Sequence, residues 1–261
     1  MERNGVGLVC AVALWIVSGC AASEPNEPAK TELVVSAAAS LTDAMKELAA
    51  KYESAVPGVD VQLNFGSSGA LQRQIGQGAP VDVFISAGSA QMDALVEQEW
   101  IMPGSRIDLL TNEMVVIVPK DSASPPSTVE DLQRERFLHI AVGQPDTVPA
   151  GGYAREALNF YGLWDRLLPQ IVFGKDVRQV LSYVETGNAD AGWVYRTDAL
   201  ASDHVSIAFA VDPQSHARIA YLAGVATNTA HPDEAMLFFN FLQQETAAQV
   251  FESYGFKAGP P

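Results

Sequence analysis

Short apolar runs alternate along the chain with segments in which apolar residues recur every three or four positions. The first pattern predicts buried strands, and the second predicts helices that cover a sheet. In the segment 41–54, for example, Leu41, Ala44, Met45 and Leu48 share one helical face. In the first half of the chain we expect strands at 32–38, 59–65, 81–87 and 113–119, and helices at 41–54, 69–78 and 89–100.

The same alternation resumes after the polar, proline-containing stretch 121–128. This second series ends in a return strand and in one or two final helices. We expect strands at 139–143, 170–174, 191–195 and 220–228, and helices at 129–136, 152–162, 177–187, 196–202 and 232–255.

Repeated alternation of strands and helices predicts an α/β fold with mostly parallel sheets flanked by helices. Two such series predict two lobes, the first built from 31–113 and 224–261 and the second from 114–223. The strands at 114–119 and 221–226 are the expected crossovers. Ligands of open parallel sheets bind beyond the carboxyl ends of the strands, so a cleft between the lobes is the expected site.

The N-terminus has the pattern of an export signal. Arg3 precedes an apolar stretch at 7–17, which is too short for a comfortable membrane span. The stretch ends in the residues VSGC, which resemble a bacterial lipoprotein signal with Cys20 as the lipidated residue. Residues 1–20 are therefore predicted to be a signal peptide and 21–30 a flexible tether. The alternative is an ordinary secretory signal in which Cys20 is incidental.

Composition narrows the function. Asp and Glu outnumber Lys and Arg by 31 to 16, and the net charge is −15, which argues against nucleic acid or an anionic membrane surface as a partner. A small anion stays possible, because local dipoles act at short range. The only cysteines, Cys10 and Cys20, lie in the leader, so the exported domain has no disulfide, thiolate metal site or cysteine nucleophile.

Four chain reversals between a strand and a helix carry the candidate chemistry. Ser40 and Ser68 precede or open helices, and Ser40 with Asp43 has the spacing of a capping box. The first N–H groups of a helix lack intrahelical partners and attract anions. Taken singly, these serines are most simply a helix cap and a turn residue.

Two more reversals and one tyrosine complete the set. Ala150 lies in the turn VPAGG, Val177 follows the N-cap candidate Asp176, and Tyr195 ends a strand and offers a phenolic donor. Taken singly, Ala150 is a loop residue, Val177 a core residue and Tyr195 a packing residue. Together the five residues could hold an oxyanion without any Lys or Arg.

The ordered set of segments is more specific than its members. VSAAASLTDAM, FGSSGALQRQIGQGAPVDVFISA, VGQPDTVPAGGYAREAL, DVRQVL and GWVYRTDAL resemble, in this order, the periplasmic molybdate-binding proteins of ABC transporters, which are type II solute-binding proteins. The resemblance covers about residues 32–256. It implies the two-lobed type II periplasmic-binding-protein fold, with molybdate or tungstate held in the cleft.

The resemblance also assigns roles. The ligand-binding residues that it implies are Ser40, Ser68, Ala150, Val177 and Tyr195. It further implies a monomer that has no cofactor, catalyses no reaction and delivers its oxyanion to an ABC transporter permease. Such a protein would work in the periplasm or at the outer surface of the cytoplasmic membrane, held there only by its lipid.

One departure from the family pattern lies next to the second serine. Gly69 and Ala70 stand where members of the family often have further hydroxyl groups. The sequence therefore predicts fewer secondary hydrogen bonds around Ser68.

Two other functions are compatible with parts of the sequence. The same fold could bind sulfate, phosphate or an organic anion, and Asp146 and Asp176 lie near the proposed loops as possible acceptors for a phosphate proton. An enzyme is the third possibility, but neither a G-x-S-x-G elbow nor a phosphate-binding P-loop is present. The four histidines include no pair at helical spacing, namely His139, His204, His216 and His231.

Overall fold

The structure is a computed structural model that describes residues 1–2 and 30–259. Apart from Met1 and Glu2, the predicted signal peptide with its lipidation residue Cys20 lies outside the described residues, as does most of the tether. Among the helices that are described, none is both long and apolar enough to cross a membrane.

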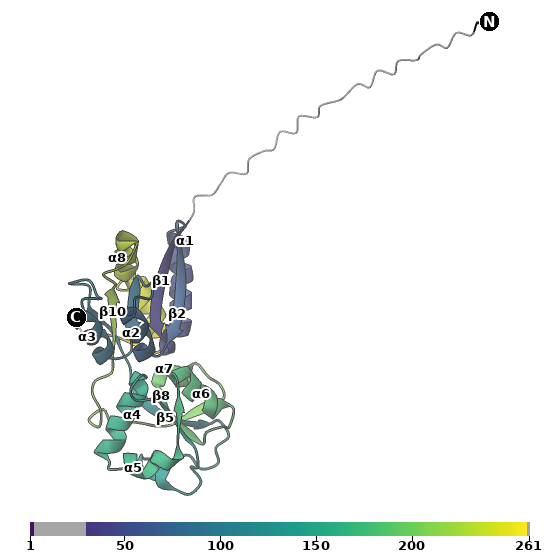
Figure 1. Cartoon of the computed structure of the whole chain (residues 1–261). Coiled ribbons are helices and arrows are strands. Elements are labelled where there is room, and N and C mark those ends of the chain that lie inside the picture. Colours follow the sequence, from purple (N-terminus) through teal and green to yellow (C-terminus); the bar gives the residue numbers. More distant parts are fainter. Residues whose placement is uncertain (3–29, 260–261) are drawn as a thin grey trace.

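Two β-sheets form the centres of two lobes, which lie one above the other in Figure 1. The six-stranded sheet of the first lobe combines the N-terminal strands with strands from the C-terminal part of the chain. Its order is β11 (Lys257–Ala258), β4 (Ile107–Thr111), β10 (Ala220–Val225), β3 (Val83–Ser86), β1 (Thr31–Ala38) and β2 (Val59–Gly66). Its helices are α1 (Thr42–Ala55), α2 (Ser68–Gly76), α3 (Ser89–Glu97), α8 (Pro232–Phe241) and α9 (Glu245–Ser253).

The second lobe has a five-stranded sheet. Its order is β7 (Ile171–Gly174), β6 (Ile140–Gly143), β8 (Ala191–Tyr195), β5 (Met114–Pro119) and β9 (Val205–Ala210). Its α-helices are α4 (Pro149–Phe160), α5 (Trp164–Leu167), α6 (Val177–Glu185) and α7 (Arg196–Leu200). In the part of the chain that the structure describes, short 3₁₀ helices span Ala39–Leu41 (η1) in the first lobe and Glu130–Gln133 (η2) and Leu168–Gln170 (η3) in the second.

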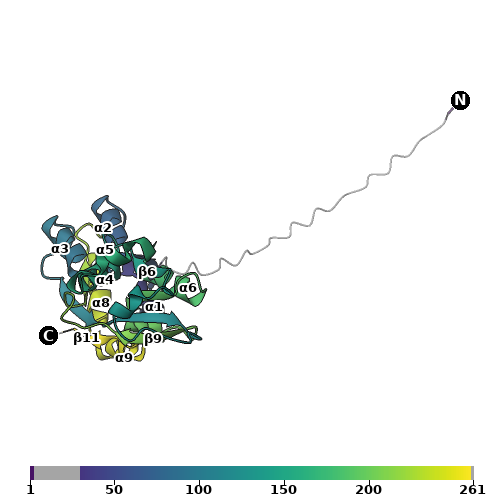
Figure 2. The same ribbon diagram turned by 90° about the horizontal axis from the view of Figure 1, so that it is seen from below.

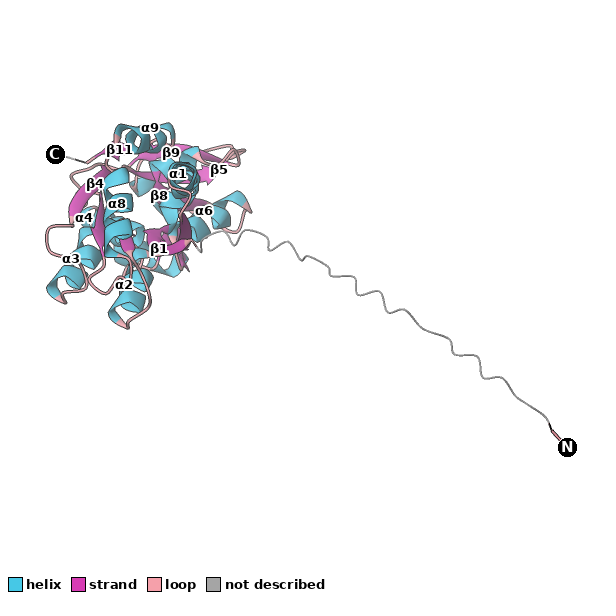
Figure 3. Ribbon diagram, turned by 90° about the horizontal axis from the view of Figure 1, so that it is seen from above, coloured by secondary structure: helices cyan, strands magenta, loops and turns pink. Residues whose placement is uncertain are grey.

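Helices cover both faces of the first sheet. On one face, Leu71 and Ile75 of α2 pack with Met92 and Leu95 of α3 against Phe84 of β3. Helices α1, α8 and α9 belong to the other, larger core. Figures 2 and 3 show α2 and α3 together on one side and α9 on the opposite side. This double cover explains why the central strands read as continuous apolar runs.

The predicted α/β fold with two lobes is confirmed, but the sheets are mixed rather than mostly parallel. Among the strand pairs of the described chain, four are parallel and five are antiparallel. Strands β4, β9 and β11 were not predicted. The predicted helix at 129–136 is only the short η2.

The crossover strands were predicted wrongly. β5 lies wholly in the second sheet and β10 wholly in the first. The chain instead crosses between the lobes at Asn112–Glu113, between β4 and β5, and again through 211–219, between β9 and β10. The predicted boundary between 223 and 224 falls inside β10, and the division of the chain into lobes stays a prediction.

Helix α6 illustrates how periodicity becomes packing. Val177, Val180, Leu181 and Val184 recur at helical spacing and are all buried. Their face packs on β6 and β8, where the helix covers the second sheet. This packing holds the first turn of α6 at the carboxyl end of the sheet, where the cleft between the lobes lies.

The start of α4 is held by an unusually close backbone approach to β6. A Cβ atom on Gly151 would lie 1.9 Å from the carbonyl oxygen of Gly143 and 2.5 Å from its carbonyl carbon. The next residue, Gly152, is open, and its nearest neighbour, the Pro145 oxygen, would be 3.6 Å from an added Cβ. The first glycine therefore sets the distance between α4 and β6, and with it the position of Ala150.

We expect Gly151→Ala to destabilise the second lobe by about 1–3 kcal/mol, because the methyl group forces α4 away from β6. Gly152→Ala is the matched control and should be neutral or slightly stabilising, since alanine favours the helix. Urea unfolding of the two variants and the parent measures the difference. Equal stability of the two variants would contradict the packing argument.

Candidate ligand-binding site

All five residues predicted to bind a ligand line one small cavity between the lobes. Its volume is about 10 Å³, roughly what one water molecule needs, so the lobes are almost closed on the site in this arrangement. Ser40 and Ser68 reach it from the first lobe, and Ala150, Val177 and Tyr195 reach it from the second. Its other lining residues are Ala38, Ala39, Gly66, Ser67, Ala87, Val148 and Pro149.

The cavity is neutral. No residue that lines it, among those the structure describes, carries an ionisable acid or base other than the Tyr195 phenol. A larger groove of about 790 Å³ runs between β4, β11 and α9, and it contains none of the predicted residues. Within residues 30–259, no group of three His, Cys, Asp or Glu side chains is arranged to hold a metal ion.

Ser40 lies in the 3₁₀ turn η1, which follows directly after β1. Its hydroxyl oxygen is 2.8 Å from the hydroxyl oxygen of Tyr221. The predicted capping box of Ser40 and Asp43 is wrong, because α1 begins at Thr42 with Leu41 as its N-cap and without a side-chain cap. The extra turn shifts the start of α1 and leaves the Ser40 hydroxyl at the cavity.

Ser68 is the first residue of α2 and is 1% exposed. Its hydroxyl oxygen accepts a hydrogen bond of 2.9 Å from the backbone N–H of Ala87, which follows β3. Because that oxygen is already an acceptor, the hydroxyl hydrogen is free to be donated into the cavity. Ser67, which sequence reasoning missed, also lines the cavity; its only signal was the adjacent serine in GSSG.

Ala150 and Val177 contribute backbone rather than side-chain chemistry. Ala150 is the second residue of α4, after Pro149, and Val177 is the first residue of α6. The predicted N-cap Asp176 is confirmed: its carboxylate accepts a hydrogen bond of 2.8 Å from the Gln179 N–H. The N–H groups of Gly151 and Gly152 donate to the carbonyl oxygen of Val148, whereas those of Ala150 and Val177 have no recorded partner in the described part of the chain. The helix dipole favours negative charge at these two helix starts.

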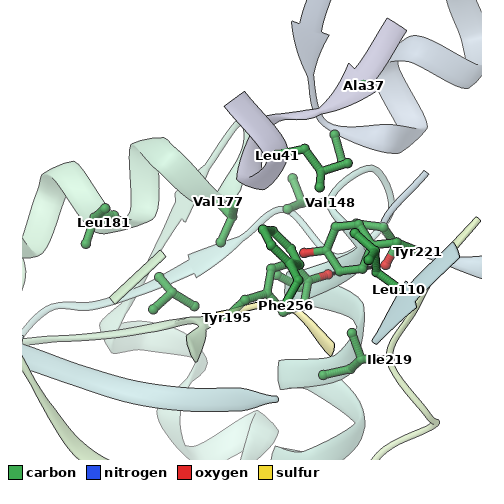
Figure 4. Packing of buried hydrophobic residues seen from close by; sticks show 14 of the residues in the cluster. Ala37, Leu41, Leu110, Val148, Val177, Leu181, Tyr195, Ile219, Tyr221 and Phe256 are labelled. Carbon is green, nitrogen blue, oxygen red and sulfur yellow. Dashed lines mark hydrogen bonds between the residues drawn. The ribbon is translucent and has the colours of Figure 1, made fainter. Parts of the chain in front are cut away.

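Tyr195 ends β8 and is almost completely buried. Its hydroxyl donates a long hydrogen bond of 3.3 Å to the carbonyl oxygen of Ala87, in the opposite lobe. Figure 4 shows its ring beside that of Tyr221, and the two ring centres are 5.7 Å apart. Burial, followed by the nearby Tyr221, raises the pKa of the Tyr195 phenol well above 10, so the phenol stays protonated, with its one hydrogen on the Ala87 carbonyl in this structure.

At Gly69 the backbones of the two lobes meet directly beside the site. Its N–H donates a hydrogen bond of 2.9 Å to the carbonyl oxygen of Thr147, just before α4. A Cβ on Gly69 would lie 2.7 Å from that oxygen and 2.8 Å from the Thr147 Cα. The departure from the family pattern at this position thus has a structural consequence: the backbones meet where a side chain would stand.

A group of paired charges lies beside the cavity lining rather than in it. Arg178 of α6 donates a hydrogen bond of 2.7 Å to Asp43 of the first lobe, and its Nε lies 3.2 Å from Oδ1 of the fully buried Asp198. Burial raises the pKa of the Asp198 carboxyl to about 7, although Arg178 acts in the opposite direction. Arg178 therefore links the lobes through one carboxylate on each side.

Comparison with known proteins identifies the family. The profile of the bacterial extracellular solute-binding proteins matches residues 33–257, which is most of the chain. The chain belongs to this family. The present chain is 42% identical to a putative ABC transporter substrate-binding lipoprotein, YvgL, of Bacillus subtilis. The match covers 98% of this chain and 99% of that relative.

Two further relatives bear on the ligand. The molybdate-binding protein ModA of Escherichia coli is 38% identical to this solute-binding protein and is matched over 98% of this chain and 99% of its own. The periplasmic molybdate-binding protein of Azotobacter vinelandii has the same fold, with a TM-score of 0.79, 25% identity, and coverage of 87% of this chain and 100% of that one. The predicted resemblance to molybdate-binding proteins is confirmed by these relatives.

We expect Gly69→Ala to oppose closure of the lobes, because its methyl group would overlap the Thr147 backbone. A strain of about 1–3 kcal/mol corresponds to a five- to more than hundredfold loss of affinity. Calorimetric titration with molybdate, the ligand that the resemblance implies, measures the loss.

The matched control is Gly76→Ala at the other end of α2, where the nearest neighbour of an added Cβ is the flexible Gln98 side chain at 3.5 Å. This variant should bind like the parent. If Gly69→Ala also binds like the parent, the contact between Gly69 and Thr147 does not form in the ligand-bound state.

Proposed function

We propose that the protein captures molybdate outside the cytoplasmic membrane and delivers it to an ABC transporter permease. One observation carries the proposal. The cavity brings Ser40, Ser68, Ala150, Val177 and Tyr195 together from both lobes and is lined by hydroxyl groups and helix starts. The relatives named as molybdate-binding proteins support the choice of oxyanion.

The arrangement favours an anion that accepts hydrogen bonds in several directions. Hydroxyl groups and the first N–H groups of helices supply hydrogen-bond donors. Each hydrogen bond is electrostatically stronger in these desolvated surroundings than in water. A tetrahedral dianion can engage such donors on all sides. Tungstate has the same charge and nearly the same size as molybdate, so we expect it to bind as well, with no cofactor needed.

Selectivity by size is the sharpest test. Sulfate carries the same charge but has shorter bonds to oxygen, so it should leave donors of the cage unpaired. Each unpaired, desolvated donor costs about 1–3 kcal/mol, and two would weaken binding by tenfold or far more. In competition calorimetry, a large excess of sulfate should fail to displace bound molybdate. Ready displacement would assign the protein to sulfate or to oxyanions in general.

Variants of Ser40 and Ser68, measured by the same calorimetry, test whether molybdate binds in this cavity. Ser40→Ala and Ser68→Ala should each weaken molybdate, and Tyr195→Phe should have a milder effect. Ser105→Ala is the matched control, since Ser105 is a buried serine of the first lobe whose hydroxyl donates to the carbonyl oxygen of Met102, away from the cavity. Unchanged binding in both Ser40→Ala and Ser68→Ala would contradict the proposed site.

We also propose that Cys20 carries a lipid that anchors the protein to the outer surface of the membrane. The residues VSGC support this, as does the similarity to a relative named as a lipoprotein. The native protein should partition with membranes, and Cys20→Ser should release it or block its processing. Mass spectrometry that finds a soluble N-terminus well beyond residue 20 would refute the anchor.

A further inference from the structure

Asn112 lies in the short crossing between the lobes, and its side chain joins both of them. Its Oδ1 accepts a hydrogen bond of 2.9 Å from the Glu113 N–H, which fixes the orientation of the amide group. Both hydrogens of Nδ2 therefore point the other way. Nδ2 donates at 2.9 Å to the Thr197 hydroxyl of α7 and at 3.3 Å to the hydroxyl oxygen of Tyr221 on β10.

The Tyr221 phenol has one hydrogen, and its direction follows from its surroundings. The side chain is fully buried, and its oxygen is already an acceptor for Asn112. The other recorded partner of this hydroxyl within the described chain is Ser40 Oγ, at 2.8 Å. If Ser40 were the donor, the phenolic hydrogen would be buried without an acceptor, which is costly. Tyr221 therefore donates to Ser40.

This direction determines what Ser40 can offer to a ligand. Since Ser40 Oγ accepts from Tyr221, the Ser40 hydroxyl hydrogen cannot point at that oxygen and is left for the cavity. Ser68 reaches the same state by a different route, because its oxygen accepts the Ala87 N–H. Both serines of the cavity are thus oriented as donors, one by a backbone amide and the other by a buried side chain.

We propose that Asn112 and Tyr221 are positioning residues that hold Ser40 as a hydrogen-bond donor to the bound oxyanion. The expected effect of these two residues on ligand affinity rests on the proposed function, the binding of molybdate. Neither residue lines the cavity; they act through Ser40. Because Asn112 also contacts Thr197 in the second lobe, the same amide ties the orientation of Ser40 to the crossing at which the lobes meet.

A packing role for Tyr221 is the competing explanation. Its ring packs edge-on against the ring of Phe256, with 5.4 Å between the ring centres, and its centre lies 5.7 Å from that of the Tyr195 ring. Tyr221→Phe keeps the ring and removes only the hydroxyl, so it separates packing from positioning. Tyr52→Phe is the matched control, since Tyr52 is also buried in the first lobe and its hydroxyl has no recorded hydrogen-bond partner.

The first test is a double-mutant cycle in which the affinity for molybdate is measured by calorimetry. Tyr221→Phe should weaken binding about tenfold, while Tyr52→Phe should leave it unchanged. In a Ser40→Ala background, Tyr221→Phe should have less than about a twofold further effect, because the phenol acts through Ser40. Parental affinity in Tyr221→Phe, or a full tenfold loss that persists in the Ser40→Ala background, would overturn the proposal.

The second test needs no ligand, so it separates this inference from the proposed function. Ser40 and Tyr221 both belong to the first lobe, and their hydrogen bond does not depend on closure. By NMR of the ligand-free protein, the Tyr221 hydroxyl proton should exchange slowly, and Ser40→Ala should accelerate its exchange. Failure of the parent to bind molybdate would refute the proposed function alone. An unchanged exchange rate of the Tyr221 hydroxyl proton in Ser40→Ala would refute only the proposal that Tyr221 donates to Ser40.

Discussion

The direct approach of backbone from the two lobes is the constraint on which the site depends. Gly69 and Thr147 meet through a hydrogen bond with no side chain between them. Within the second lobe, Gly151 brings α4 against β6 in a similar way. These contacts bring the starts of α2 and α4 to opposite walls of one small cavity. A methyl group at either glycine would overlap backbone atoms of its neighbour, so a helix start would have to shift.

A second feature of the site is that the hydroxyl oxygens of Ser40 and Ser68 already take part in hydrogen bonds within the protein. The oxygen of Ser68 accepts a backbone N–H, and the oxygen of Ser40 is bonded to the Tyr221 phenol. A serine hydroxyl has one hydrogen to donate and two lone pairs that can accept, so an internal donor to its oxygen leaves its hydrogen for the ligand. A cage built in this way presents donors without placing any positive charge on the ligand, which is consistent with the acidic character of the whole chain.

Charge is kept at the rim, where it links the lobes. Arg178 contacts Asp43 across the cleft and lies beside the buried Asp198 of its own lobe. An ion pair of this kind is half exposed and contributes modestly to stability. It forms between lobes, however, so its contribution applies to the closed arrangement. Together with Asn112 at the crossing, it connects closure of the lobes to the geometry of the residues around the ligand.

The amino-acid sequence by itself determined the alternation of strands and helices and the two lobes, and its resemblance to a known family pointed to five of the residues that line the cavity. Periodicity and small residues at strand ends are local properties, so they are visible along the chain; the N-cap Asp176 was found in this way. Only the tertiary structure decided which strands share a sheet, and it moved the crossings to Asn112–Glu113 and 211–219. It also replaced the expected cap at Ser40 by a hydrogen bond to Tyr221, which is 181 positions away. Pairings of this length leave no local pattern, because they depend on how two sheets bring distant segments of the chain together.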